Sequence, residues 1–331
     1  MASSTGSRAG LLGAGLALLL ALALIGCGDD SPPRPTGPLA VALSEIGGGG
    51  EHGSLGVGWS EPALARQAGI PPRLIARALA PNAETVVERR AVLLRRFGLD
   101  PLSADRLISV GGSYAFGLRL DGVDGTGLRD ALIQAGGRAR EADGFQIVDV
   151  GPYAQVPEPL HEAGVFGLGA RDGFGPSSTV LAISLTARAA LLGRGDRLID
   201  QPVYRAAADC LGGVAAVRMI PDKLLLSTDV GVDLVAVGLA RGREVLCTLG
   251  GTAERAREVA ANLRTALGPG ARDPRLGTPI AAEVRAPEVE TTSYEGVQAV
   301  RATVTPVGGR PRGFFLSTIG RGSLVQMMNG E

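Results

Sequence analysis

The chain has 331 residues, of which 45% are apolar and 20% charged, so it can bury at least one sizeable core as one large domain or two. Thirty-three basic residues balance thirty-three acidic ones, which argues against a nucleic-acid partner, since that requires a strongly basic surface. Lys223 is the only lysine, and we interpret the prevalence of arginine as a coding bias rather than as guanidinium chemistry.

The first apolar segment covers residues 11–25 and follows a single cation, Arg8. A membrane-spanning helix needs roughly 20 apolar residues, so this shorter run is typical of the hydrophobic region of a signal peptide. The segment ends in Leu24, Ile25, Gly26 and Cys27. This order of an aliphatic, a variable and a small residue before cysteine resembles the lipobox of bacterial lipoprotein signal peptides.

The lipobox resemblance covers residues 1–27 and implies a cleaved signal peptide at residues 1–26. It also implies that the Cys27 thiol carries a diacylglycerol, so the membrane is the first partner of the chain. The expected location is the extracytoplasmic side of the cell membrane, because two or three acyl chains hold a protein there firmly. The alternative is an ordinary buried cysteine in an apolar helix.

Residues 28–38 are polar and rich in proline, which predicts an extended tether. Four glycines at residues 47–50 predict a second hinge, and the apolar stretch between them, LAVALSEI, is ambiguous. We therefore expect a flexible tether at residues 27–53 and a globular region at residues 54–331. A boundary between two subdomains is expected near residues 170–180.

Short apolar runs predict the strands of the globular region. They cover residues 55–59, 114–120, 145–150, 164–170, 179–184, 214–220, 233–239, 244–249, 297–304 and 313–319. The last two are expected to form a hairpin through residues 307–311. Helices fall between the strands, and one extends from Asn82 to about Phe97, with Val86, Val87 and Leu94 near its buried face.

The clearest helix covers residues 252–268, because Thr252 can cap it and Gly268 with Pro269 ends it. Its buried face is expected to carry Ala256, Val259, Ala260, Leu263 and Leu267. This mixture of strands and helices predicts an α+β fold with a largely antiparallel sheet packed on helices. Three strand-then-helix units, beginning near residues 114, 179 and 245, suggest duplicated subdomains.

Residues 180–213 resemble a stretch of poorly characterised actinobacterial envelope proteins. The resemblance rests on Leu198, Asp200, Pro202, Tyr204, Arg205 and Ala206, and covers about a tenth of the chain. It agrees with an envelope location and implies no chemistry.

Cys210 and Cys247 are the only cysteines that remain beyond the lipobox. In an exported protein an even pair is most simply a disulfide, which would link a predicted helix to a predicted strand. The alternative is two separate buried thiols.

Catalytic and metal-binding signals are weak. His161 lacks the second histidine of an HExxH motif, and His52 lies in the glycine-rich hinge. Ser113 lies before a predicted strand rather than on the strand-to-helix turn that a serine nucleophile needs. The glycines at residues 167–175 and 249–256 lack the full spacing of a phosphate loop. We therefore predict no cofactor, no metal and no catalytic residue.

Trp59 is the single tryptophan, and it is the one candidate for stacking on a ligand, although a tryptophan at a strand end more often covers a core. We expect a lipid-anchored cell-envelope protein with a non-catalytic binding or structural role. A small solute or lipid would bind in an apolar pocket near Trp59. An assembly factor would instead present a broad exposed patch to a membrane complex, and an envelope hydrolase is the least favoured class.

Overall fold

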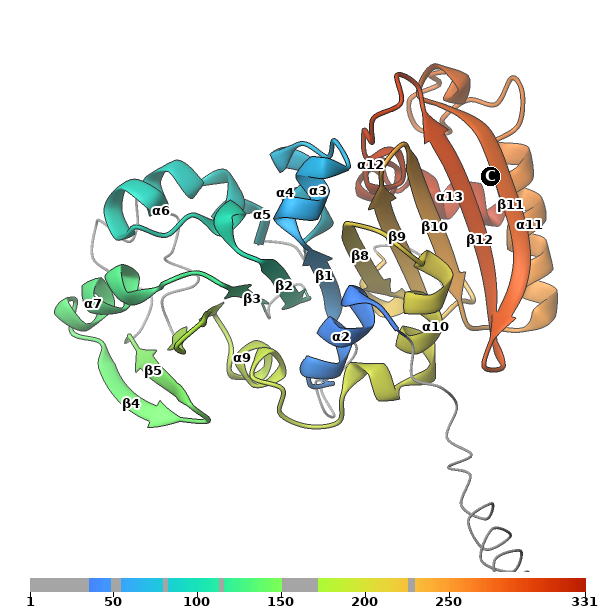
Figure 1. Ribbon diagram of the computed structural model, residues 1–331. Coiled ribbons are helices and arrows are strands. Elements are labelled where there is room, and N and C mark those ends of the chain that lie inside the picture. Colours follow the sequence, from blue (N-terminus) through green and yellow to red (C-terminus); the bar gives the residue numbers. More distant parts are fainter. Residues whose placement is uncertain (1–35, 49–54, 80–82, 113–115, 151–171, 226–229) are drawn as a thin grey trace, which may run out of the picture. The chain divides into compact units, whose positions relative to one another are not determined.

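The computed structural model describes residues 36–48, 55–79, 83–112, 116–150, 172–225 and 230–331. Residues Thr36–Glu331 form one compact unit, in which an antiparallel sheet packs against helices (Figure 1). This arrangement confirms the predicted α+β class. The subdomain boundary near residues 170–180 stays a prediction, and the strands on either side of it belong to one sheet.

The described residues contribute twelve strands to the sheet, in the order β11-β12-β10-β9-β8-β1-β2-β3-β7-β6-β5-β4. Their bounds are β1 Gly56–Ser60, β2 Arg106–Gly111, β3 Phe116–Asp121, β4 Arg138–Ala142, β5 Phe145–Asp149, β6 Asp172–Phe174, β7 Ser178–Ala182, β8 Ala216–Pro221, β9 Leu234–Ala240, β10 Arg243–Leu249, β11 Val284–Tyr294 and β12 Val297–Pro306. The antiparallel pair β1–β8 joins the two halves of the sheet, with Val57 opposite Met219.

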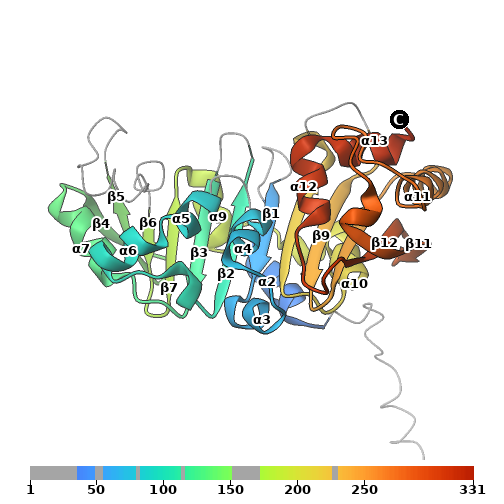
Figure 2. The same ribbon diagram turned by 90° about the horizontal axis from the view of Figure 1, so that it is seen from above.

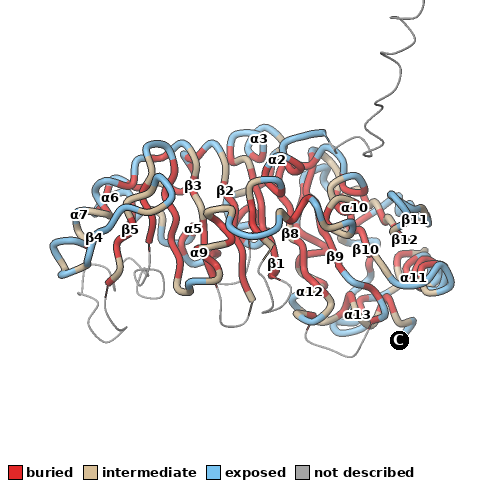
Figure 3. Tube along the Cα trace, turned by 90° about the horizontal axis from the view of Figure 1, so that it is seen from below, coloured by how far each residue is buried: buried red, intermediate tan, exposed pale blue. Residues whose placement is uncertain are grey.

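Helices cover both faces of the sheet, and each face has its own hydrophobic core. Much of the central strands between these helices is buried (Figure 3). The first core lies under α3 Pro62–Gln67, α4 Pro72–Ala78, α5 Ala83–Glu88, α6 Arg90–Phe97, α7 Thr126–Gln134, α11 Ala253–Ala266, α12 Phe314–Arg321 and α13 Ser323–Asn329. The second core lies under α2 Pro38–Glu45, α9 Leu185–Leu191 and α10 Pro202–Leu211. Figure 2 shows the helices of the first core spread along the sheet.

The strand β9 is apolar along its whole length because both of its faces are buried. In β9, Val235 and Val237 belong to the first core, whereas Leu234 and Ala236 belong to the second. This explains why β9 appears in the sequence as a continuous apolar run instead of an alternating pattern.

The three predicted strand-then-helix units are β3–α7, β7–α9 and β10–α11. The first and third occupy similar places, since β1-β2-β3 and β8-β9-β10 lead outward from the central pair and each continues into a helix of the first core. The halves then differ, because the sheet continues beyond β10 with β12 and β11 and beyond β3 with β7, β6, β5 and β4.

The predicted strand at residues 313–319 is wrong, since this segment forms most of α12. A short apolar run is compatible with either a strand or a buried helix. Here Gly313 has a left-handed φ of 75° and starts the helix, so the predicted hairpin through residues 307–311 is absent. The observed hairpin lies between β11 and β12, where Glu295 and Gly296 both have positive φ.

Two further predictions need correction. The helix expected up to Phe97 is split into α5 and α6, and Leu94, expected on the buried face, is 49% exposed. The strands β2, β4, β6 and β11 were not predicted from the sequence. Of these, β4 and β11 lie at the edges of the sheet, where they are polar, largely exposed and without a strong apolar pattern. The strand predicted at residues 164–170 lies outside the described residues.

The folded unit begins earlier than residue 54. Residues of the ambiguous stretch form α2, in which Leu39, Ala42 and Leu43 are buried in the second core. Gly47 then bridges to Arg197, and its amide donates to the carbonyl of Ala190. The predicted tether at residues 27–53 is therefore too long, because its second half contains a packed helix.

Candidate functional site

A cavity of about 530 Å³ lies on the first-core side of the sheet, where the strands β8 and β9 meet α12 and α13. Small-molecule sites usually occupy about 300–1,000 Å³ and combine apolar walls with a few polar groups. Apolar lining residues come from β8, β9, α12, α13 and the short segment after β8, and include Ile220, Leu224, Val235, Ile319, Leu324 and Met328. The cavity is thus large enough for a small molecule with an apolar body.

Glycines keep one side of the cavity open. Gly56 of β1 and Gly111 of β2 are paired across the strands, and both line the cavity together with Gly112. A Cβ atom on Gly56 would lie 3.0 Å from the Gly111 carbonyl oxygen and 3.5 Å from Leu224 Cδ1. A larger residue at this position would therefore crowd both the sheet and the cavity wall.

Three arginines line the cavity, Arg218 from β8, Arg275 from the segment before β11, and Arg321 from the end of α12. Glu331 is the one carboxylate residue among the described lining residues, and it is exposed. Arg321 is paired with Asp273 at 2.7 Å, whereas the Nε of Arg275 donates to the neutral Oε1 of Gln326 at 3.0 Å.

Arg218 is half-buried and has no ion pair to any residue in the described part of the chain. Its Nη1 donates to the carbonyl of Arg77 at 3.1 Å, while its buried Nε has no hydrogen-bond partner. Burial lowers the pKa of its guanidinium, and the charge of Glu84 opposes this effect. A buried donor without a partner is costly, so this arginine is a candidate for recognising an anion.

The Asp273 carboxylate holds the corner between α12 and α13. Its Oδ1 accepts hydrogen bonds from the Ser323 hydroxyl at 2.9 Å and from the amides of Arg275 and Leu276 at 2.9 and 3.0 Å. Its Oδ2 accepts from Arg321 at 2.7 Å. Asp273 therefore positions two of the three arginines that line the cavity.

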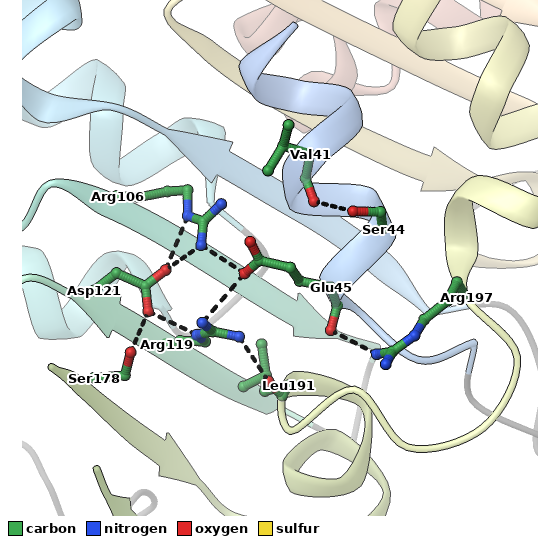
Figure 4. Close-up of polar contacts among 9 residues, drawn as sticks. All are labelled: Val41, Ser44, Glu45, Arg106, Arg119, Asp121, Ser178, Leu191 and Arg197. Atoms are coloured by element: carbon green, nitrogen blue, oxygen red, sulfur yellow. Dashed lines mark hydrogen bonds and ion pairs between the residues drawn. The ribbon is translucent and has the colours of Figure 1, made fainter. Parts of the chain in front are cut away.

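A second charged cluster joins α2 to the opposite face of the sheet (Figure 4). The Nη2 atom of Arg106 is 2.6 Å from both Glu45 Oε2 and Asp121 Oδ2, and Arg119 also pairs with both carboxylates. Burial alone would raise the pKa of Asp121, but the Ser178 hydroxyl and the two guanidinium groups bring it below its usual value. The two arginines and two carboxylates neutralise one another. The cluster therefore holds α2 against the sheet, and each of its four charged groups already has a partner.

Two more carboxylates are fully buried. Glu244 of β10 accepts hydrogen bonds from the amides of Arg312, Gly313 and Phe315 and so caps α12, although burial still raises its pKa. Asp172 accepts from the amide of Ala182, and its pKa is raised well above the usual value by burial, with Arg188 opposing. Neither residue lines the cavity.

The structure brings Cys210 of α10 and Cys247 of β10 together in a disulfide, with Cα atoms 6.3 Å apart. This bridge links the helix layer of the second core to the sheet. Cys27, His52, Ser113 and His161 lie outside the described residues.

Trp59 does not line the cavity. It is 1% exposed and belongs to the second core, on the opposite face of the sheet, and its Nε1 has no hydrogen-bond partner in the described structure. The proposed ligand-stacking role of Trp59 therefore has no support from the geometry, because a side chain buried in a different core does not reach the cavity.

The described residues contain no cluster of three or more potential metal ligands and no helix with the length and apolarity needed to cross a bilayer. The N-terminus of α11, which follows the glycines of residues 249–256, is capped by the Thr252 hydroxyl, and Gly250 lies against Asp233. The nearby carboxylate makes this helix start unsuited to phosphate.

Neither the known protein-family models, nor the curated proteins, nor the solved structures contain a match to this chain. The cavity itself was missed by sequence reasoning, because its residues are spread from Gly56 to Glu331. The one available signal was Arg218, a lone arginine inside the apolar run VAAVRMI.

Proposed function

We propose that this protein is a lipid-anchored binding protein of the bacterial cell envelope, which holds a small apolar or amphipathic molecule without transforming it. The cavity between the sheet and the α12–α13 pair carries this proposal, since its volume of about 530 Å³ and mainly apolar lining suit such a ligand. The lipobox at residues 24–27 supports the location.

Because α2 is part of the folded unit, the tether to Cys27 is shorter than predicted. Its length limits how far the binding unit can lie from the membrane. Ten residues, Gly28–Gly37, separate Cys27 from the first residue of α2. An extended chain covers at most about 3.5 Å per residue, so this tether can reach about 35 Å. The ion pairs of Glu45 with Arg106 and Arg119 would resist a pull on α2.

An assembly factor is the second candidate class, and it would need a broad apolar surface. In the described part of the chain, the large apolar side chains that are exposed are scattered over separate segments: Val41, Leu64, Leu94, Ile133, Leu185 and Leu276. This distribution favours binding within the cavity over docking on an apolar patch.

Native mass spectrometry of the full chain extracted from bacterial envelopes tests the binding role. We expect a bound small molecule that is lost in Val325→Trp, because the indole would fill the cavity that Val325 lines. The control is Val41→Trp, an exposed position on α2. A tightly bound protein with no small molecule would instead support the assembly factor.

Metabolic labelling with a palmitate analogue tests the anchor. Cys27→Ser should lose the label and release the protein from the membrane. Equal labelling of the wild type and this variant would refute lipidation at Cys27.

A further inference from the structure

We propose that the ligand is an amphipathic anion whose acidic head group binds Arg218 and whose apolar body occupies the rest of the cavity. This inference rests on the proposed binding function and specifies the chemistry of the ligand. The acid is a carboxylate or a phosphate on an acyl-type chain, because both offer oxygen acceptors to a guanidinium.

The charges around the cavity identify Arg218 as the head-group residue. Asp273 already neutralises Arg321, and Arg275 is exposed and holds the neutral Gln326 side chain. Arg218 has only the carbonyl of Arg77 as a partner, so its charge lacks a carboxylate within ion-pair distance among the described residues. An anion would supply this missing counterion.

The position of Arg218 makes such an interaction selective. β8 is a central strand, and Arg218 lies between Gly58 of β1 and Val237 of β9 in the sheet. Because neither neighbour carries a polar side chain, no side chain beside Arg218 in the sheet competes for its guanidinium. Charge-assisted hydrogen bonds are roughly twice as strong as neutral ones, and more so away from water.

The remaining lining explains why the ligand should also carry an apolar body. Leu224 follows β8, Val235 belongs to β9, and Leu324 and Met328 project from α13. A small inorganic anion would leave this apolar lining in contact with water, whereas a hydrocarbon chain would bury it. The pairing of one unpartnered cation with an apolar space therefore favours an amphiphile over a free ion.

Binding measurements on the full chain in nanodiscs test the proposal, with photoreactive diazirine probes that share one C12 chain. The probes carry a carboxylate, a phosphate or an uncharged hydroxyl as the head group. We expect the two acids to label α12 and α13, and the alcohol to bind more weakly by about tenfold to a hundredfold, the range for one hydrogen bond to a charged group.

Arg218→Gln should remove the preference for acids, and Arg218→Lys should retain part of it. Arg257→Gln is the matched control, since Arg257 is exposed on α11 and does not line the cavity. Equal unfolding midpoints for the three variants would show that a change in probe preference comes from binding and not from lost stability.

The outcomes separate this inference from the proposed function. If acid and alcohol label the cavity equally in wild type and Arg218→Gln, anion recognition by Arg218 is overturned while the apolar binding role stands. If no probe labels the cavity and Val325→Trp does not change the bound mass in native mass spectrometry, the anion recognition and the proposed binding role are both overturned. A preference for only one of the two acids supports the inference and identifies the head group.

Discussion

Replacing Asp273 by alanine should loosen the α12–α13 corner, because this side chain is fully buried and accepts four hydrogen bonds. The substitution leaves the Arg321 guanidinium without its counterion and the amides of Arg275 and Leu276 without their acceptor. The Ser323 hydroxyl loses a partner as well. No other carboxylate in the described structure pairs with Arg321 to replace it.

The expected loss of stability follows from these contacts. Removing one partner of a buried ion pair costs about 3–5 kcal/mol. The Arg321 side chain is 27% exposed, so water can solvate part of its charge and the loss should be about 3 kcal/mol, near the lower limit. Asp273→Asn keeps one acceptor oxygen and should cost about 1–2 kcal/mol.

Urea unfolding of the full chain at pH 7 measures this loss as a lower midpoint with an unchanged m value. Asp130→Ala is the control, because Asp130 is 50% exposed and pairs with Arg129 on the surface. That pair should contribute less than about 1 kcal/mol. Equal midpoints for Asp273→Ala and Asp130→Ala would refute the view that Asp273 holds this corner.

The pH dependence provides a second check on Asp273. Burial alone would raise its pKa, but the hydrogen bonds from Leu276, Ser323, Arg275 and Arg321 outweigh this effect and lower the pKa. Its stabilising contribution is therefore present above the pKa of the unfolded chain and is lost as pH falls through the lower folded value. The stability gap between wild type and Asp273→Asn should narrow at acidic pH.

Non-reducing peptide mapping should recover Cys210 and Cys247 as one linked pair, and reduction should cost about 4 kcal/mol for a separation of 37 residues; two free thiols would contradict this. Asp172 has the opposite pH behaviour, since its raised pKa means that its contribution is greatest below the unfolded pKa and falls as pH rises through the folded value. Between acidic and neutral pH, the free energy of unfolding should therefore fall less in Asp172→Asn than in wild type. An equal fall in both would show that Asp172 does not cause it. A screen of esterase, peptidase, phosphatase and glycosidase substrates should show no turnover, because the sequence has two histidines and no serine in the pattern of a strand-to-helix nucleophile turn. Reproducible activity abolished by His161→Ala or Ser113→Ala would restore the hydrolase class.

Local patterns in the sequence were sufficient for the fold class and for most central elements. The buried strand β9 consists of continuous apolar residues, and α11 carries its cap and its apolar face within its own segment. The lipobox at Cys27, which stays a prediction, also depends only on adjacent residues. These features are readable because their causes lie within a few positions of one another.

The tertiary structure alone decided the features that depend on distant residues. Residues 314–321 become a helix where Glu244, 69 positions before Gly313, supplies a carboxylate to its first amides. The residues of α2 form an ambiguous apolar stretch in the sequence, and only the contacts of Leu39 and Leu43 with the second core show that they pack as a helix. In the sequence Arg218 is a lone arginine in an apolar run. Only the convergence of β8, β9, α12 and α13 places it at a cavity, because burial and pairing arise from contacts that sequence neighbours do not make.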